Sequence, residues 1–172
     1  IPVCNEQDNV LPLAREIHAA LASRYRFETI FVDDGSTDRT AEAAHRARED
    51  GMPEIRLIRH SVRSGQSAAV ATGVRLARAP WIATLDGDGQ NDPADLPHML
   101  DEARRLGVDC VTGVRAKRQD NFIRKFSSRV GNGFRNWITG DRVADSGCGV
   151  RVVRAACVGE LPVFNGLHRF MP

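Results

Sequence analysis

The sequence predicts an α/β domain in which a mainly parallel sheet is covered by helices on both faces. Short apolar runs alternate along the whole chain with segments whose apolar residues recur at helical spacing. Acidic residues directly follow several of the apolar runs, and parallel sheets bind ligands beyond the carboxyl ends of their strands. The 172 residues, 42% of them hydrophobic, suffice for one compact domain and are too few for two full ones. We therefore expect a single domain over residues 1–172.

The first part of the chain predicts two pairs of strand and helix. Apolar residues 1–3 indicate a strand, and apolar positions at three- and four-residue spacing predict an amphipathic helix over residues 10–21. Residues 27–32 are a β-rich run that stops at two acids and a glycine. Regularly spaced alanines then predict a helix over residues 41–50. The candidate caps of this helix are Ser36, Thr37 and Asp38.

The same alternation continues through the next sixty residues. The further strand-like runs are residues 55–58, 81–85 and 108–112. Between them, residues 67–77 are rich in alanine and valine and predict a helix. Asp92 is expected to cap a last periodic helix that carries Pro93 in its first turn and ends near Leu106.

Residues 114–143 form a basic segment with a different texture. Between residues 115 and 142 there are eight basic and only two acidic residues. Its apolar residues fall near one helical face: Phe122, Phe126, Val130, Phe134, Trp137 and Ile138. A basic amphipathic helix of this kind can lie against an anionic membrane surface or a phosphate-bearing lipid, and a merely solvated face is the alternative. Residues 145–153 then predict a glycine-rich turn into a final strand.

Composition excludes several classes of protein. The net charge of only +2 argues against a general nucleic-acid binder. No apolar run approaches the roughly 18 residues of a membrane span, and no signal peptide is visible, so we expect a soluble, cytoplasmic-type domain. The chain lacks an initial methionine and both of its ends look cut, which leaves a membrane segment after residue 172 open. The four cysteines form no CxxC pair and suggest neither a zinc site nor a disulfide framework.

The stretch LDGDGQNDP at residues 85–93 is the first candidate binding site. Asp86, Asp88 and Gln90 present oxygen ligands at alternate positions directly after a strand-like run, and such ligands suit Mg²⁺ or Mn²⁺. The intervening glycines leave room for a bulky ligand. A plain polar turn between strand and helix is the alternative. An EF-hand is disfavoured because the expected sixth-position glycine and twelfth-position glutamate are Asn91 and Pro97.

A second candidate site follows the 27–32 run. Asp33 and Asp34 stand where acids bind a ribose hydroxyl or a base N–H group. The backbone amides at the following helix start, from Ser36 onward, favour phosphate. The alternative interpretation is simply a capped helix, since serine, threonine and aspartate are the usual caps.

Five short motifs occur in order along the chain. They are PVCNE at residues 2–6, VDDGSTDRT at 32–40, LDGDGQNDP at 85–93, GVR at 113–115 and DSGCGVRVVR at 145–154. Together they resemble family 2 glycosyltransferases of the GT-A fold, in the branch of dolichyl-phosphate mannose synthase and the bacterial polyprenyl-phosphate glycosyltransferases. RSGQSAAV at residues 63–70 also resembles the bacterial branch. The resemblance implies a GT-A catalytic domain with a Rossmann-like, mainly parallel sheet.

The resemblance implies a nucleoside-binding group. Pro2 and Glu6, with Asp33 and Asp34, would hold the nucleoside of the donor. One departure concerns the residue before Asn-Glu, which is usually tyrosine in these enzymes and is Cys4 here. An aromatic contact to the base is therefore not expected.

The resemblance also implies metal and phosphate ligands. Asp86 and Asp88 stand in the family's DxD positions, with Asp88 and Gln90 near the metal and the diphosphate. Arg115, at the GxR position, would neutralise phosphate at the junction of donor and acceptor. Arg129, together with Ser128, matches a Ser-Arg pair of the acceptor region. The catalytic residues implied are thus Asp88, Arg115 and Arg129.

The implied reaction is metal-dependent, inverting transfer of a hexose-type sugar from a UDP- or GDP-sugar to a polyprenyl phosphate. The acceptor's phosphate oxygen is already anionic, so no strong general base is required. Mg²⁺ or Mn²⁺ is the implied cofactor. The implied location is the cytoplasmic face of the inner membrane, where the domain would be peripheral or anchored.

Two alternatives stay open at the level of sequence. A family 2 enzyme acting on a sugar hydroxyl would need a carboxylate base, for which Asp145 is the candidate, but the QxxRW motif of polysaccharide synthases is absent. The other is a nucleotide-sugar-binding domain without transferase activity.

Overall fold

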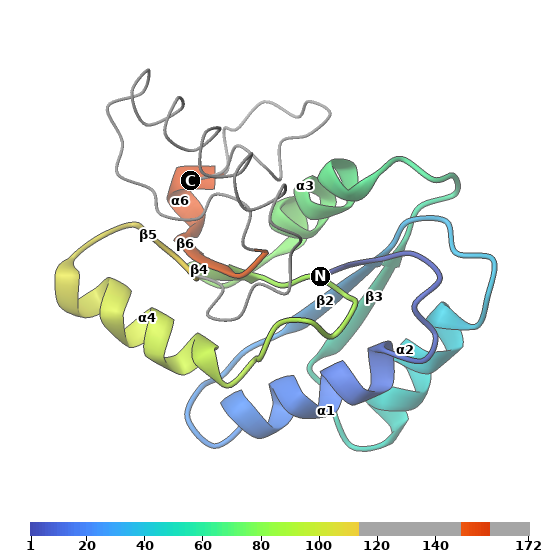
Figure 1. Cartoon of the computed structure of the whole chain (residues 1–172), viewed down its shortest axis with the longest axis horizontal. Coiled ribbons are helices and arrows are strands. Elements are labelled where there is room, and N and C mark those ends of the chain that lie inside the picture. The colour runs from blue at the N-terminus through green and yellow to red at the C-terminus, as the bar shows by residue number, and fades with distance from the viewer. Residues whose placement is uncertain (114–148, 159–172) are drawn as a thin grey trace, which may run out of the picture.

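The computed structural model describes residues 1–113 and 149–158, and Figure 1 shows helices packed around a central layer of strands. The strands are β1 (Pro2–Val3), β2 (Thr29–Asp33), β3 (Ile55–Arg59), β4 (Trp81–Thr84), β5 (Cys110–Thr112) and β6 (Arg151–Arg154). The helices are α1 (Val10–Leu21), α2 (Thr40–Glu49), α3 (Gln66–Leu76), α4 (Asp95–Leu106) and the short α6 (Ala155–Val158).

The described strands pair into two three-stranded sheets. In the first sheet, β1, β2 and β3 lie side by side and run parallel, with Val3 opposite Asp33 and Asp33 opposite Arg59. In the second sheet, β6 lies between β4 and β5 and is antiparallel to both, so that Thr84 and Thr112 both face Arg151. The first sheet confirms the expected parallel arrangement, and β6 is an antiparallel insertion.

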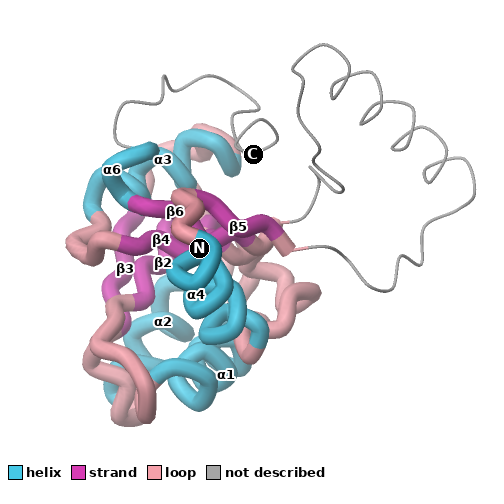
Figure 2. The backbone as a smooth tube through the Cα atoms, turned by 90° about the vertical axis from the view of Figure 1, so that its left-hand side faces the viewer, coloured by secondary structure: helices cyan, strands magenta, loops and turns pink. Residues whose placement is uncertain are grey.

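Helices cover both faces of the strand layer, as predicted. Figure 2 shows α3 and α6 on one side of the strands and α1, α2 and α4 on the other. Successive side chains of β2 point to opposite faces of the sheet, as the pleat of a strand requires. Phe31 packs in the cluster formed with α1, α2 and α4, whereas Ile30 and Val32 pack against Ala69 of α3.

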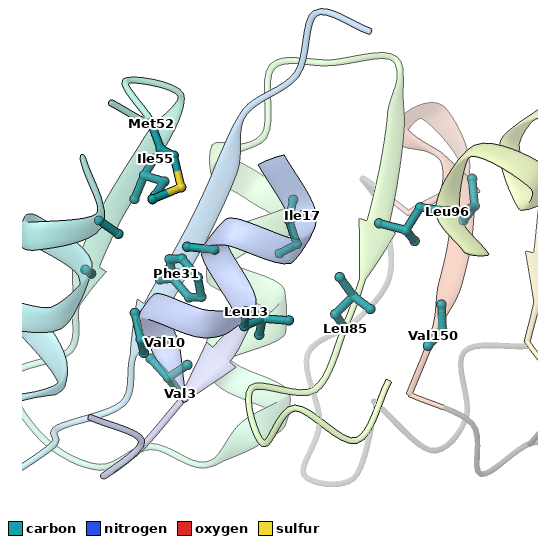
Figure 3. Close-up of a cluster of buried hydrophobic side chains, with 14 of the residues drawn as sticks. Val3, Val10, Leu13, Ile17, Phe31, Met52, Ile55, Leu85, Leu96 and Val150 are labelled. Carbon is teal, nitrogen blue, oxygen red and sulfur yellow. The ribbon is translucent and has the colours of Figure 1, made fainter. Parts of the chain in front are cut away.

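The larger apolar cluster joins the two sheets and lies next to the carboxyl ends of β1, β2 and β4. Val3 and Phe31 come from the first sheet, Leu85 follows β4, and Val150 precedes β6 (Figure 3). Phe31 is completely buried and Leu85 is 3% exposed. Each such side chain contributes about 1.5–3 kcal/mol by leaving water. The cluster therefore fixes the ends of β1, β2 and β4 relative to one another.

The start of α4 differs from the sequence-based expectation, whereas the start of α2 agrees with one of its three candidate caps. The last long helix was expected from Pro93, but α4 begins at Asp95, because Asp92 first forms a turn in which its Oδ1 accepts the Ala94 N–H at 2.9 Å. At α2, Asp38 alone of the three candidate caps reaches the helix start. Its Oδ1 accepts the backbone N–H of Thr40 at 3.0 Å.

Several predicted features lie outside the described residues. One is the basic segment 114–143, which contains Arg115, Ser128 and Arg129, and another is Asp145. Within residues 1–113 and 149–158, no helix is both long enough and apolar enough to cross a lipid bilayer.

Candidate functional site

A polar cleft of about 400 Å³ opens at the carboxyl ends of the parallel strands. Pro2, Val3, Cys4 and Glu6 line it at the end of β1, and Asp34 lines it after β2. Arg63, Gly65 and Gln66 reach it between β3 and α3, and Asp86, Gly87 and Asp88 follow β4. Its volume falls in the usual range for small-molecule sites.

The loops after β1 and β2 hold each other in place beside this cleft. Asn5 adopts a left-handed backbone conformation with φ 58°. Its N–H donates to Ser36 Oγ at 2.9 Å, and its Oδ1 accepts the Thr37 N–H at 2.9 Å. The Glu6 N–H donates to Thr40 Oγ1 at 2.8 Å. Asn5 and Ser36 therefore build the rim of the cleft rather than line it.

Asp33 lies beneath the cleft and is wholly buried. Its Oδ1 accepts the Ser36 N–H and its Oδ2 accepts Arg59 Nε, each at 2.9 Å. A buried carboxylate is tolerated because both of its oxygens are satisfied in this way. Asp33 thus shapes the turn at residues 33–36 and is not among the residues that line the cleft.

Asp34 lines the cleft but is already heavily hydrogen-bonded. Its Oδ1 accepts the Ser64 N–H at 2.8 Å and lies 2.8 Å from His60 Nδ1, while Oδ2 accepts the Gly65 N–H at 2.7 Å. Burial by itself would raise the pKa of the Asp34 carboxyl, but the hydrogen bonds from Ser64, His60 and Gly65 together hold its pKa below the ordinary value. His60 is oriented in turn by Thr72, whose Oγ1 lies 3.0 Å from Nε2.

Asp86 is held from two sides. Gln66 Nε2, at the start of α3, donates to Asp86 Oδ1 at 2.9 Å. The other oxygen lies so close to Gly149 that any side chain at that position would overlap the carboxylate. Gly87 is restricted as well, because a Cβ there would lie 2.6 Å from Val3 Cγ1 and 2.7 Å from the carbonyl oxygen of Pro2. These two glycines allow the end of β4, the end of β1 and the start of β6 to meet at the acid.

Asp88 is the exposed member of the acidic pair. Its Oδ1 accepts the backbone N–H of Gln90 at 3.0 Å, which curls the loop after β4 back on itself. Gln90 is exposed and is not among the residues that line the cleft. Within the described residues, no cluster of three or more His, Cys, Asp or Glu side chains forms a metal site.

The donor set nevertheless suits a hard divalent cation shared with a phosphate-bearing ligand. The described lining contains four carboxylates, from Glu6, Asp34, Asp86 and Asp88, against one guanidinium, from Arg63. Carboxylate oxygens are what Mg²⁺ and Mn²⁺ prefer, and Mg²⁺ usually takes one or two from the protein and the rest from water and phosphate. A cleft this acidic would repel a free diphosphate, so a bridging cation fits the chemistry of the lining.

The structure brings together five of the predicted site residues at one cleft. These residues are Pro2, Glu6, Asp34, Asp86 and Asp88. Asp33, Ser36 and Gln90 lie near the cleft without lining it, and their predicted ligand contacts stay predictions.

Three residues of the site were not singled out from sequence. They are Arg63 and Gln66, which line the cleft, and Gly149, which backs Asp86. The motif RSGQSAAV contains the first two and carries a glycine immediately before α3, which was the available signal. Gly149 lies within the motif DSGCGVRVVR, but no local pattern shows that it packs against Asp86, which is 63 positions away in the chain.

The chain matches a known protein family over most of its length. The family described as Glycosyl transferase family 2 matches residues 1–155. Over its whole length, the chain is 38% identical to a dodecaprenyl-phosphate galacturonate synthase of Rhizobium johnstonii and covers 52% of that protein. It is 34% identical to an undecaprenyl-phosphate 4-deoxy-4-formamido-L-arabinose transferase of Edwardsiella ictaluri and covers 53% of that protein. The chain therefore spans about half the length of the curated relatives it matches.

Solved structures support the fold. A mannosyltransferase from Pyrobaculum calidifontis in complex with GDP-Man and Mn²⁺ matches with TM-score 0.69 and 23% identity, over 95% of this chain and 46% of that one. A glucosyl-3-phosphoglycerate synthase from Mycobacterium tuberculosis matches with TM-score 0.74 and 18% identity, over 94% and 57%. At these identities the likeness establishes the fold alone, which is the GT-A fold expected from the motifs.

Proposed function

The chain belongs to glycosyl transferase family 2, and we propose that it transfers a hexose-type sugar from a UDP- or GDP-sugar to a polyprenyl phosphate, with inversion at the anomeric carbon. The proposal is supported most by the agreement between the substrates named for the relatives and the acidic cleft of this chain. The two curated relatives described above are both named for polyprenyl-phosphate substrates or products. The matched region contains an acidic cleft of about 400 Å³, which is within the usual range for small-molecule sites and supports the proposal.

Asp86 and Asp88 are the residues proposed to hold the cation. Asp86 is oriented by Gln66 and backed by Gly149, and Asp88 is exposed at the mouth of the cleft. Mn²⁺ occurs with a nucleotide sugar in structures of two fold neighbours, a mannosyltransferase and a glucosyl-3-phosphoglycerate synthase. When bound here, Mg²⁺ or Mn²⁺ would supply positive charge to the nucleotide diphosphate that leaves the sugar.

The nucleoside is proposed to lie at the ends of β1 and β2. Pro2 and Glu6 line the cleft on one side and Asp34 lines it on the other. Glu6 is prearranged by Asn9, whose Nδ2 donates to Glu6 Oε2 at 2.6 Å. A preordered carboxylate loses little entropy when it accepts a hydroxyl or N–H group of a ligand.

The acceptor's phosphate is proposed to be the nucleophile. A phosphate oxygen is already anionic at neutral pH, so the protein needs to orient it rather than deprotonate it. Arg115 and Arg129 are the residues proposed for that task, since guanidinium groups bind phosphate through paired hydrogen bonds.

The basic segment 114–143 is proposed to meet the lipid. Its eight basic residues between positions 115 and 142 suit the anionic surface on the cytoplasmic side of the inner membrane. The domain would act there as a peripheral or anchored protein.

A comparison of acceptors tests the proposal. The chain is incubated with UDP- and GDP-sugars, Mn²⁺ and either undecaprenyl phosphate or undecaprenol, and the lipid products are identified by mass spectrometry. We expect a polyprenyl-phosphate sugar from the phosphate and no product from the alcohol. Transfer to the alcohol equal to transfer to the phosphate would contradict the proposal that an anionic phosphate is the nucleophile.

A base-removal variant separates the two acceptor classes further. Asp145→Asn removes the carboxylate that a hydroxyl acceptor would require. We expect near-normal turnover with undecaprenyl phosphate, because the phosphate carries its own charge. Loss of most of the turnover in a folded variant would instead support Asp145 as an essential base.

A further inference from the structure

The loop between β3 and α3, residues 60–65, carries an arginine into the cleft. Arg63 is exposed and lines the same cleft as Glu6, Asp86 and Asp88. Arg59, by contrast, is paired with the buried carboxylate of Asp33. Within residues 1–113 and 149–158, Arg63 makes no hydrogen bond or ion pair. Its guanidinium is therefore available to a ligand.

Asp34 fixes the backbone of this loop through hydrogen bonds. Both carboxylate oxygens of Asp34 bind the loop, Oδ1 through the Ser64 N–H at 2.8 Å and Oδ2 through the Gly65 N–H at 2.7 Å. Ser64 Oγ also donates to the carbonyl oxygen of Val62 at 3.1 Å. The loop is thus ordered up to and beyond Arg63 before any ligand arrives.

A second contact holds the loop from the side. Gly35 has φ 72°, and a Cβ there would lie only 2.9 Å from the backbone nitrogen of Arg63 and 3.1 Å from the carbonyl carbon of Val62. The turn at residues 33–36 and the loop therefore touch through backbone atoms. The backbone of Arg63 therefore lies next to the turn that follows β2.

Asp34 has little capacity left for a ligand. It is 4% exposed, and three donors already approach its two oxygens, from Ser64, Gly65 and His60. A carboxylate offers about four acceptor sites in all. Asp34 is thus better placed to organise the loop than to bind a nucleoside directly.

We propose that Arg63 binds the diphosphate of the nucleotide-sugar donor directly and that Asp34 is a positioning residue, which acts on the donor by holding the loop that presents Arg63. This inference rests on the proposed function, since it takes the donor to be a nucleotide diphosphate. Among the described residues that line the cleft, Arg63 alone supplies positive charge, and a guanidinium matches the geometry of phosphate oxygens.

Binding of UDP and GDP in the presence of Mn²⁺ tests the role of Arg63. By calorimetry, Arg63→Ala is expected to raise the Kd of whichever diphosphate the wild type binds by about tenfold to a hundredfold, with partial recovery in Arg63→Lys. The matched control is Arg48→Ala on α2, an exposed arginine that does not line the cleft, and it should leave the Kd unchanged.

The matching nucleoside separates a phosphate contact from a base contact. Competition by uridine or guanosine should be the same for Arg63→Ala and the wild type. A diphosphate Kd within twofold of the wild-type value, or equal weakening of the nucleoside, would overturn the assignment of Arg63. If the wild type binds neither UDP nor GDP, the proposed function fails and this inference fails with it.

A double-mutant cycle tests the role of Asp34. If Asp34 acts through Arg63, Asp34→Asn weakens diphosphate binding, and Asp34→Asn combined with Arg63→Ala binds no more weakly than Arg63→Ala alone. Additive losses would show that Asp34 contacts the donor by itself and would overturn the positioning role. Circular dichroism of each variant checks that the fold is retained. If Asp34→Asn does not fold, the Arg63 single variants still test the contact between Arg63 and the diphosphate.

Discussion

The Asp86 carboxylate lies against the backbone of Gly149, with no room for a side chain between them. Gly149 belongs to the segment that enters β6, and Asp86 follows β4, which pairs with β6. Pairing of β4 with β6 therefore places the Asp86 carboxylate beside Gly149, where the missing side chain leaves room for it. Gln66 completes the arrangement from α3 by donating to the carboxylate at 2.9 Å. Three segments remote in sequence thus fix one candidate metal ligand.

Gly149→Ala is expected to impair metal-dependent donor binding. The new methyl group would overlap the Asp86 carboxylate and force it out of its place. Loss of one oriented ligand should weaken binding of the donor with Mn²⁺ by about tenfold or more, as measured by calorimetry.

Gly73→Ala is the matched control for this change. A Cβ at Gly73, within α3, would lie 3.4 Å from Val32 Cγ2, which is ordinary contact. It should leave donor affinity unchanged and stabilise α3 by up to about 1 kcal/mol. Equal donor affinity in Gly149→Ala and the wild type would contradict the account of Asp86.

Stability at low pH should depend on Asp34. Its hydrogen bonds from Ser64, His60 and Gly65 outweigh the effect of burial and hold its pKa below the ordinary value of 3.8. Because the folded pKa is lower than the unfolded one, charged Asp34 stabilises the fold above about pH 4, and this contribution is lost as the pH falls through the folded pKa.

Thermal melts of Asp34→Asn at pH 7 and pH 3 measure this contribution. The variant should be less stable than the wild type at pH 7 by about 1–3 kcal/mol, and the gap should narrow at pH 3. Asp8→Asn removes an equal charge from an exposed residue and should change stability by less than about 0.5 kcal/mol at either pH. A gap that stays constant between the two pH values would contradict the assignment.

Phe31 should be the most costly truncation in the larger apolar cluster. It is completely buried in β2, where it packs with residues of α1 and α2. Phe31→Ala is expected to cost about 3–5 kcal/mol in urea unfolding, from lost burial and the cavity left behind. Val62→Ala, at a side chain that is 67% exposed, should stay within about 0.5 kcal/mol of the wild type. A cost below about 1 kcal/mol for Phe31→Ala would mean that this core is not packed as described.

The sequence was sufficient to predict features that depend on local patterns. In α1, Val10, Leu13 and Ile17 recur with the helical period and are the residues that become buried. The positions of Asp34 and Asp86 after strands followed from the apolar runs that precede them. Parallel pairing then brings such residues to one edge of the sheet, so the location of the cleft was predictable as well.

Features that depend on contacts between distant segments were not predictable in this way. Periodicity does not show that β6 inserts antiparallel between β4 and β5. Nor does it show that Asp34 forms its hydrogen bonds with residues 26 to 31 positions away. Because of these hydrogen bonds, Asp34 is proposed as a positioning residue, although the sequence predicted a nucleoside ligand. The start of α4 moved to Asp95 because a side-chain turn at Asp92 competes with the helix.

The cleft at Asp86 and Asp88 is proposed to bind a nucleotide-sugar donor through a divalent cation. Calorimetric titration of the chain with UDP- and GDP-sugars, with Mn²⁺ or with EDTA, tests this claim most directly when wild type and Asp88→Asn are compared. We predict that at least one donor binds the wild type only with the metal, and that Asp88→Asn weakens this binding by about a hundredfold. Donor binding that is equally tight with EDTA, or unchanged in Asp88→Asn, would contradict it.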